Sequence, residues 1–148
     1  MKDSILMTWN DSMSSRGALD YLVGLPMCRE DVRITLLHVF RKASASEELM
    51  GKTFTEKEKE RFLKLLQNTK DKLVEKGFLP ENINIIMAEE PYPTIAEGII
   101  DQFKKENFDM VLIGRKRMSK AEEFVMGDIS IKLVRALEHT AVMVVTSL

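Results

Sequence analysis

Small, polar and basic residues gather in two short segments of this sequence, and each segment follows an apolar run. The first is Asn10-Asp11-Ser12, which comes directly after Ile5–Trp9. The second extends from Gly114 to Asp128 and contains four basic residues, Arg115, Lys116, Arg117 and Lys120. Free backbone N–H groups where a glycine-bounded turn opens a helix bind anions. We therefore expect an anion site here. Asp128 argues against it, because its carboxylate would repel a second negative charge.

Five strand-like runs and four helix-like segments alternate along the chain. The strands are expected at 5–9, 32–40, 83–87, 110–113 and 141–145, with apolar residues at helical spacing in the segments between them. This β-α alternation predicts an α/β fold with right-handed crossovers: one doubly wound domain over residues 1–148, with a five-stranded parallel sheet flanked by four helices. Of the two common strand orders for such a sheet, we expect 3-2-1-4-5.

Glycine and proline residues mark where these elements should end. Gly24 and Gly77 are expected to stop two of the helices, the second of which covers 56–76, and residues 41–55 are expected to form a long connection. Pro91 and Pro93 are expected to break the chain after the third strand, and Thr94 is expected to cap the next helix.

In an open α/β sheet, ligands bind outside the carboxyl ends of the strands, where the strand order reverses. With the order 3-2-1-4-5, the loops after the first and fourth strands meet at this crevice. Those loops are the two polar segments described above, so we expect them to form one site.

Three segments of this chain resemble universal stress proteins: Thr35–Val39, Val111–Gly114 and Gly127–Val145. The resemblance covers nearly the whole chain and implies the same fold. In nucleotide-binding members, the loop after the fourth strand reads G-x2-G-x9-G followed by Ser or Thr. The glycines let the backbone approach phosphate and ribose, and the hydroxyl donates to a phosphate.

The resemblance implies a degenerate nucleotide site in this chain. Gly114 and Gly127 have the right separation, but Arg117 stands at the middle glycine and Asp128 at the hydroxyl. The family's acidic residue after the first strand falls at Asn10, with Asp11 at the usual glycine and Ser12 beside it. The matching positions are Val39, whose counterpart faces adenine through its backbone, and Ser130, which keeps a hydroxyl in the helix. We therefore expect ATP binding to be lost or altered and no bound cofactor, with ATP or AMP as the alternative ligands.

The candidate site residues also have purely structural interpretations. Asp11 and Asp128 are suited to cap helices, and the basic loop is suited to a solvated surface. His38 is expected to lie in the core or to line a ligand with its ring hydrogen-bonded, and Trp9 is expected to fill the core or to wall off the pocket. The histidines and Cys28 have no metal-ligand spacing, so no metal site is predicted.

Composition restricts the partners. The 22 basic and 23 acidic residues leave a net charge of −1, which predicts no attraction to nucleic acid or to a membrane surface. No apolar stretch approaches the roughly 18 residues of a membrane span, and the amino-terminal apolar run is too short for a secretory signal. With Cys28 as the single cysteine, a cytoplasmic protein is expected.

The sequence favours a binding protein over an enzyme. It has no Ser-His-Asp order, no nucleophile elbow and no GxxxxGK[ST] loop, so no catalytic residue is predicted, with slow ATP turnover left open by the resemblance. A receiver domain would need an Asp after the third strand and a Lys after the fifth, where Glu89-Glu90 and Thr146-Ser147 stand. A flavodoxin-like domain would need a Thr- and Gly-rich loop after the first strand, which is missing too.

The last strand provides the remaining hypothesis. The run Ala141-Val142-Met143-Val144-Val145 has no charge and no proline, the features that usually protect an edge strand from pairing. The universal stress protein scaffold that the chain resembles dimerises by pairing this strand edge to edge. We therefore expect a homodimer acting as a regulatory or interaction module, with an adenine-nucleotide-binding stress protein as the alternative.

Overall fold

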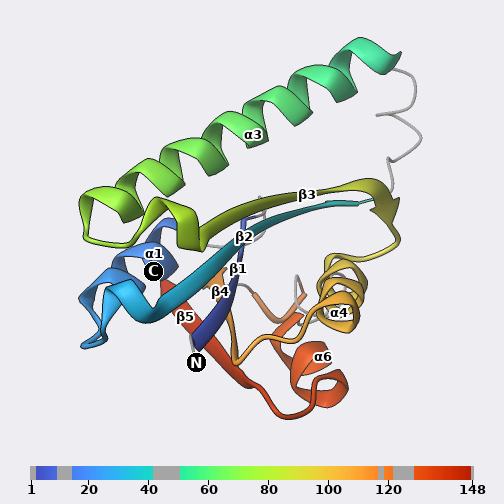
Figure 1. Cartoon of the computed structure of the whole chain (residues 1–148). Coiled ribbons are helices and arrows are strands. Elements are labelled where there is room, and N and C mark those ends of the chain that lie inside the picture. Colours follow the sequence, from blue (N-terminus) through green and yellow to red (C-terminus); the bar gives the residue numbers. More distant parts are fainter. Residues whose placement is uncertain (1–2, 10–14, 42–50, 117–118, 122–128, 148) are drawn as a thin grey trace.

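The computed structural model describes residues 3–9, 15–41, 51–116, 119–121 and 129–147. Five parallel strands form one sheet in the order β3-β2-β1-β4-β5, as predicted (Figure 1). Their bounds are β1 Asp3–Thr8, β2 Val32–Arg41, β3 Ile83–Tyr92, β4 Met110–Lys116 and β5 Ala141–Ser147.

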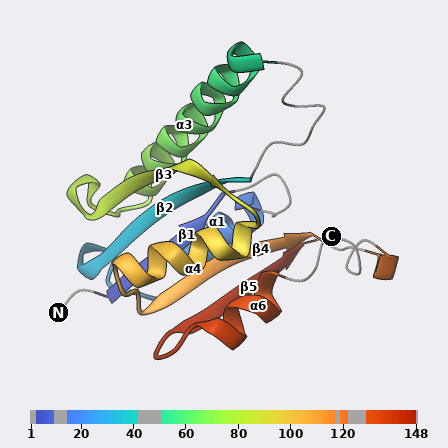
Figure 2. The ribbon, with the colours of Figure 1, turned by 90° about the vertical axis from the view of Figure 1, so that its right-hand side faces the viewer.

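Four longer helices are present among the described residues, and they cover the two faces of the sheet. Their bounds are α1 Ser15–Gly24, α3 Gly51–Glu75, α4 Ile95–Lys105 and α6 Ile129–Ala136, and two short 3-10 turns span Arg29–Asp31 and Pro80–Asn82. Helices α1 and α3 pack over one core cluster, and α4 and α6 pack over the other. Figure 2 shows the resulting layers, with α3 on one side of the sheet and α4 and α6 on the other.

Strand alternation divides the core between these two layers. On β1, Ile5 and Met7 belong to the cluster under α1 and α3, whereas Leu6 belongs to the cluster under α4 and α6. All three side chains are almost fully buried. Because the sheet is covered on both faces, its central strands show continuous apolar runs rather than alternation.

Two of the predicted helix ends are confirmed in detail. Helix α3 ends at Glu75, and Gly77 has a φ of 102°, with backbone bonds from Gly77 N to Val74 O and from Phe78 N to Leu73 O. A left-handed residue with these two bonds is a Schellman cap, which favours glycine. At the start of α4, the Thr94 hydroxyl accepts a hydrogen bond from Glu97 N at 3.2 Å.

Two predicted boundaries are wrong. Helix α3 begins at Gly51 rather than near residue 56, so residues 51–55 are helical; residues 42–50 of the expected connection lie outside the described part of the chain. Strand β3 continues through Pro91 to Tyr92 instead of ending near Met87. A proline is tolerated there because β3 is an edge strand, and the β2–β3 register shifts between Val39 and Arg41 at the same place.

No helix in the described ranges is long and apolar enough to cross a membrane.

Candidate functional site

The expected crevice lies between the carboxyl ends of β1 and β4, where the strand order reverses. Strand β1 pairs with β2 on one side and with β4 on the other, in a register that places Met7 opposite Leu112. Continuing this register by two residues brings Trp9 level with Gly114. The chain therefore leaves β1 and β4 at the same edge of the sheet, as a common binding crevice requires.

Six of the predicted site residues fall outside the described residues, namely Asn10, Asp11, Ser12, Arg117, Gly127 and Asp128. The other three can be placed. Gly114 is buried in β4 and pairs with Val145 of β5, Val39 is buried near the end of β2, and Ser130 is half-buried in the first turn of α6. Val39 and the α6 residue Leu133 belong to the core cluster on the face of the sheet that α4 also covers.

Val39 is held in place by a close approach of α4. A Cβ atom built on Gly98 of α4 would collide with Val39 Cγ1 and would lie 3.0 Å from Val39 Cγ2 and from Tyr92 Cδ2. Helix α4 therefore approaches β2 so closely at this point that only a residue without a side chain fits. This contact fixes Val39, the residue whose backbone the resemblance assigns to the adenine side of the crevice.

Trp9, the described residue that follows β1, is tied to β2 through both of its backbone groups. Trp9 N donates to Leu37 O at 2.8 Å, and Trp9 O lies 2.6 Å from His38 Nδ1. Because a carbonyl oxygen only accepts, Nδ1 must carry the hydrogen. The imidazole of His38 therefore sets the direction in which the chain leaves β1 toward the first polar segment.

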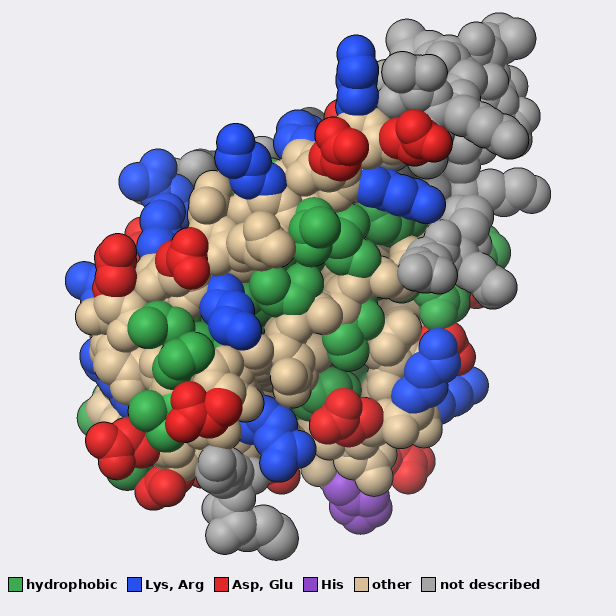
Figure 3. Space-filling view, turned by 45° about the horizontal axis from the view of Figure 1, so that its top comes forward, with side chains coloured by type: hydrophobic (Ala, Val, Ile, Leu, Met, Phe, Trp, Pro, Cys, Tyr) green, Lys and Arg blue, Asp and Glu red, His purple; other side chains and the backbone are tan. Residues whose placement is uncertain are grey.

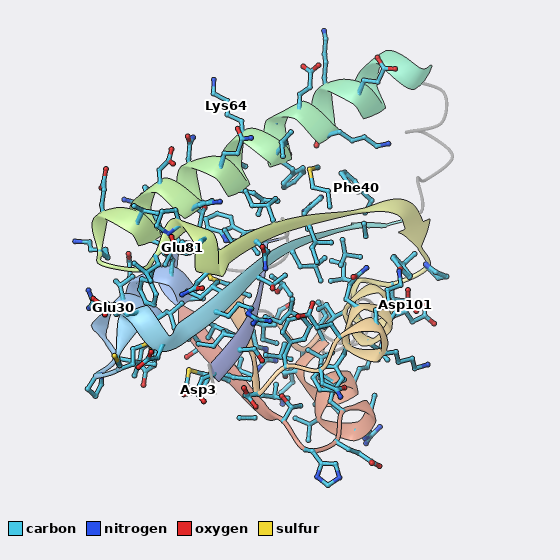
Figure 4. All side chains as sticks on the ribbon, viewed as in Figure 1. Asp3, Glu30, Phe40, Lys64, Glu81 and Asp101 are labelled. Atoms are coloured by element: carbon cyan, nitrogen blue, oxygen red, sulfur yellow. The ribbon has the colours of Figure 1, made fainter. Side chains whose placement is uncertain are left out.

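An aromatic cluster holds the His38 ring. The ring is 4% exposed, stacks on Phe62 of α3 with centroids 3.7 Å apart, and meets the edge of Phe40 at 4.5 Å. Arg61 covers Phe62 at 4.6 Å from the ring centroid, and Lys59 lies 5.8 Å from that of Phe40. Figure 4 shows Phe40 between the sheet and α3. His38 is thus a core residue with a hydrogen-bonded ring, one of the two roles expected from the sequence.

The partly buried Trp9 side chain packs on the same core cluster as α1 and α3. Of the two roles expected for it, the structure favours filling the core. Its indole Nε1 is buried and has no hydrogen-bond partner among the described residues.

Replacing His38 should be visible in the fluorescence of Trp9, the single tryptophan of the chain. In His38→Leu the donor to Trp9 O is lost, so we expect a shift of the emission to longer wavelength and stronger quenching by acrylamide. In His38→Asn the amide nitrogen can take the place of Nδ1, so the emission should remain close to that of the unmodified protein. Equal shifts in the two variants would show that the hydrogen bond does not hold Trp9.

The described part of the basic segment begins at the end of β4. Arg115 is half-buried and is paired in register with Thr146 of β5, and Lys120 is exposed. No group of three or more His, Cys, Asp and Glu side chains among the described residues is placed to hold a metal ion. The described part of this segment is suited to binding through backbone and cationic groups.

The chain matches the family model of the universal stress protein family over residues 1–145. A search of curated protein sequences found no match. Among solved structures, the chain is similar to a hypothetical protein studied as a test case of structural genomics, with 20% identity and a TM-score of 0.75 over 100% of this chain and 98% of the other.

Two other similar structures contain nucleotides. One is a universal stress protein in complex with cAMP, with 12% identity and a TM-score of 0.67 over 97% of this chain and 96% of that one. The other is a universal stress protein family protein from Arabidopsis thaliana with AMP bound, with 17% identity and a TM-score of 0.65 over 99% and 92% of the two chains. At these identities the likeness establishes the fold alone.

Proposed function

Because the chain belongs to the universal stress protein family, we propose that it is a homodimeric regulatory or interaction module of the cytoplasm, joined through β5, in which ATP binding is lost or altered. We propose further that residues 1–148 form a single domain that acts by binding rather than by catalysis.

The observation that carries the dimer is the unprotected edge of β5. This strand has one neighbour, β4, so the backbone groups along its other side have no partner within the sheet. Residues 141–145 contain neither a charged residue nor a proline, and the side chains of 142–145 are half-buried. Such an edge favours pairing with another strand, and a two-fold pairing satisfies both copies symmetrically.

Helix α6 adds apolar surface next to this edge. It packs on β5 through the cluster that contains Leu133, while Ile131 is 50% exposed and Val134 is 63% exposed. Burial of exposed apolar side chains contributes roughly 25 cal/mol per Å². A dimer built on β5 would extend over α6 and would gain this contribution in addition to the strand pairing.

Light scattering after size-exclusion chromatography tests the dimer. At micromolar concentration we expect twice the monomer mass of 17.0 kDa. A mass of one monomer under these conditions would overturn the proposal.

The second candidate function is adenine-nucleotide binding. It is supported by the AMP and cAMP complexes of the two similar proteins and by the agreement of Val39, Gly114 and Ser130 with the family pattern. Arg117 and Asp128 act against it, since a carboxylate about 4 Å from a phosphate charge costs on the order of 1–4 kcal/mol. The basic side chains of the same segment would partly offset this cost.

Calorimetric titration with ATP and AMP, with and without magnesium, separates the two candidates. We expect little or no heat with the unmodified protein and a gain of ATP binding in Arg117→Gly combined with Asp128→Ser. Absence of a gain in the double variant would show that these two positions do not cause the loss, and Asn10 and Asp11 would then be tested. Tight ATP binding by the unmodified protein would favour the second candidate.

A further inference from the structure

A cavity of about 730 Å³ lies along the free edge of β3, beside α4. The β3 residues Ile86, Met87 and Ala88 line it. Ile86 packs on the cluster under α4, whereas Met87 packs on the cluster under α3. Since side chains from both faces of the strand border one cavity, the cavity must run along the backbone at the edge.

The edge of β3 is open to hydrogen bonding over this length. In the described part of the chain, strand β3 pairs only with β2, so every second residue directs its N–H and C=O groups away from the sheet. Residues Ile83–Ala88 contain no charge and no proline, and Pro91 limits the open stretch at its carboxyl end. Figure 3 shows hydrophobic side chains gathered along this strand below α3, with acidic and basic side chains around them.

The α4 wall of the cavity carries opposite charges at its two ends. Glu97 lies in the first turn of the helix, Asp101 lies near its middle, and Lys104 and Lys105 lie in its last turn. Because α4 returns antiparallel to the strands, the acidic end lies near the end of β3 and the basic end near its start. Ile100 lines the cavity between the two ends.

Tyr92 and Lys105 both contact the carboxylate of Asp101, near the middle of α4. The Tyr92 hydroxyl donates to Asp101 Oδ2 at 2.5 Å, and Lys105 Nζ lies 3.5 Å from the same oxygen. The hydrogen bond from Tyr92 is the main cause of a lowered pKa of Asp101, and Lys105 contributes. At pH values above 3.8, the ordinary pKa of an aspartate, the ionised carboxylate therefore stabilises the folded protein. This contribution is lost as the pH falls through the lower pKa that Asp101 has in the folded protein.

Tyr92→Phe should raise the pKa of Asp101 toward 3.8, because the donor to its carboxylate is removed. The titration can be followed by the ¹³C chemical shift of the Asp101 carboxyl group. An unchanged titration would show that Tyr92 does not donate a hydrogen bond to Asp101.

From this geometry we propose that the β3 edge and the adjoining cavity bind an extended peptide segment of another protein, which adds a strand to the sheet. Main-chain groups of the peptide pair with β3, and alternate side chains face α4. One apolar side chain enters the cavity beside Ile86 and Ile100. An acidic residue on one side of it faces Lys104 and Lys105, and a basic residue on the other side faces Glu97.

The spacing of the charges fits a strand. From Glu97 to Lys104 the helix rises about 10 Å, at 1.5 Å per residue. Side chains on one face of a strand lie about 6.7 Å apart, so positions i and i+4 are about 13 Å apart. Lysine side chains span the difference. The matching pattern is therefore acidic, apolar and basic at every second residue.

A second copy of this chain is a poorer occupant. If both β3 and β5 paired with their own copies, two different two-fold contacts would join the chains into an open fibre of sheets rather than a closed dimer. A peptide occupies the β3 edge and leaves β5 free for the dimer.

The test uses the peptide acetyl-Thr-Asp-Thr-Leu-Thr-Lys-Thr-amide with ¹⁵N-labelled full-length protein. We expect chemical-shift changes in Ile86–Ala88 and along α4, saturating at up to millimolar peptide. Two further peptides of the same sequence are the controls for strand pairing. In one the odd-numbered backbone nitrogens are methylated, and in the other the even-numbered ones. One of the two methylated peptides should bind at least tenfold more weakly, because it lacks the N–H groups that face β3. No shifts on β3, or equal binding of all three peptides, would overturn the proposal.

Charge reversal tests the orientation. Lys104→Glu with Lys105→Glu should weaken binding of the peptide about tenfold, and replacing its Asp by Lys should restore it. Lys70→Glu with Lys72→Glu, on α3, is the matched control and should leave binding unchanged. If the α3 pair weakens binding as much as the α4 pair, or if the lysine peptide gives no recovery, the assignment of the acidic residue to Lys104 and Lys105 is wrong.

Discussion

Val144→Lys is expected to weaken the proposed dimer about 100-fold while the monomer stays folded. Val144 lies half-buried on the open strand β5, on the face that packs under α6, and a lysine there would place a charge beside the seam of the two paired strands. A lysine on an edge strand is a common device against edge-to-edge pairing. A 100-fold change corresponds to about 2.8 kcal/mol, which is within the cost of partly desolvating a charge. Sedimentation equilibrium over a range of concentrations measures the change.

The matched control is Val74→Lys. Val74 is 36% exposed on α3, on the other side of the sheet from α6, so its replacement should leave the dimer unchanged. Circular dichroism and the melting temperature show whether Val144→Lys still folds. If it does not, Val134→Lys on α6, at a side chain that is 63% exposed, gives an independent test of the same surface. A folded Val144→Lys that dimerises as well as the unmodified protein would contradict pairing through β5.

Gly98→Ala is expected to destabilise the protein by about 2 kcal/mol. The new Cβ would collide with Val39 Cγ1, and a well-packed core accommodates an extra methyl group at a cost of about 1–3 kcal/mol. Alanine has the higher helix propensity, by about 1 kcal/mol, so a measured loss would come from the collision alone. The free energy of unfolding in urea measures the effect.

Gly24→Ala is the control for this substitution. No atom lies within 4 Å of a Cβ at Gly24, so the stability should stay the same or rise slightly. Val39→Ala removes the methyl groups that the new Cβ would meet. The double variant Gly98→Ala, Val39→Ala should therefore lose less free energy of unfolding than the two single variants lose together. Additive effects, or a Gly98→Ala variant as stable as the unmodified protein, would show that α4 can move away from β2 without loss.

Most of the fold follows from local patterns in the sequence. The apolar runs of β1 and β4 are buried on both faces, and Thr94 and Gly77 act as caps in the way that their types predict. The errors arise where tertiary position overrides a local signal. Pro91 breaks a central strand but is tolerated in β3, and only the strand order shows that β3 is an edge.

The candidate site was less predictable. The predicted strand order is confirmed, and it brings the ends of β1 and β4 to the same edge of the sheet, whereas the binding site expected there stays a prediction. The tie between Trp9 and His38 could not be predicted, since it joins residues 29 positions apart through a backbone oxygen. Part of the aromatic cluster was predictable, because side chains two residues apart on a strand, such as those of His38 and Phe40, lie on the same face of β2. The charged cavity beside β3 depends on how α4 packs over the sheet, which no local pattern contains.

Hydrogen exchange of the β5 amides tests the proposed dimer most directly, since it reports both pairing and its place. If β5 pairs with its copy, alternate amides between Ala141 and Val145 should become protected as the protein concentration rises from nanomolar to micromolar, while those of the central strand β1 stay equally protected throughout. Amides of β5 that exchange at the same rate at every concentration would contradict the dimer.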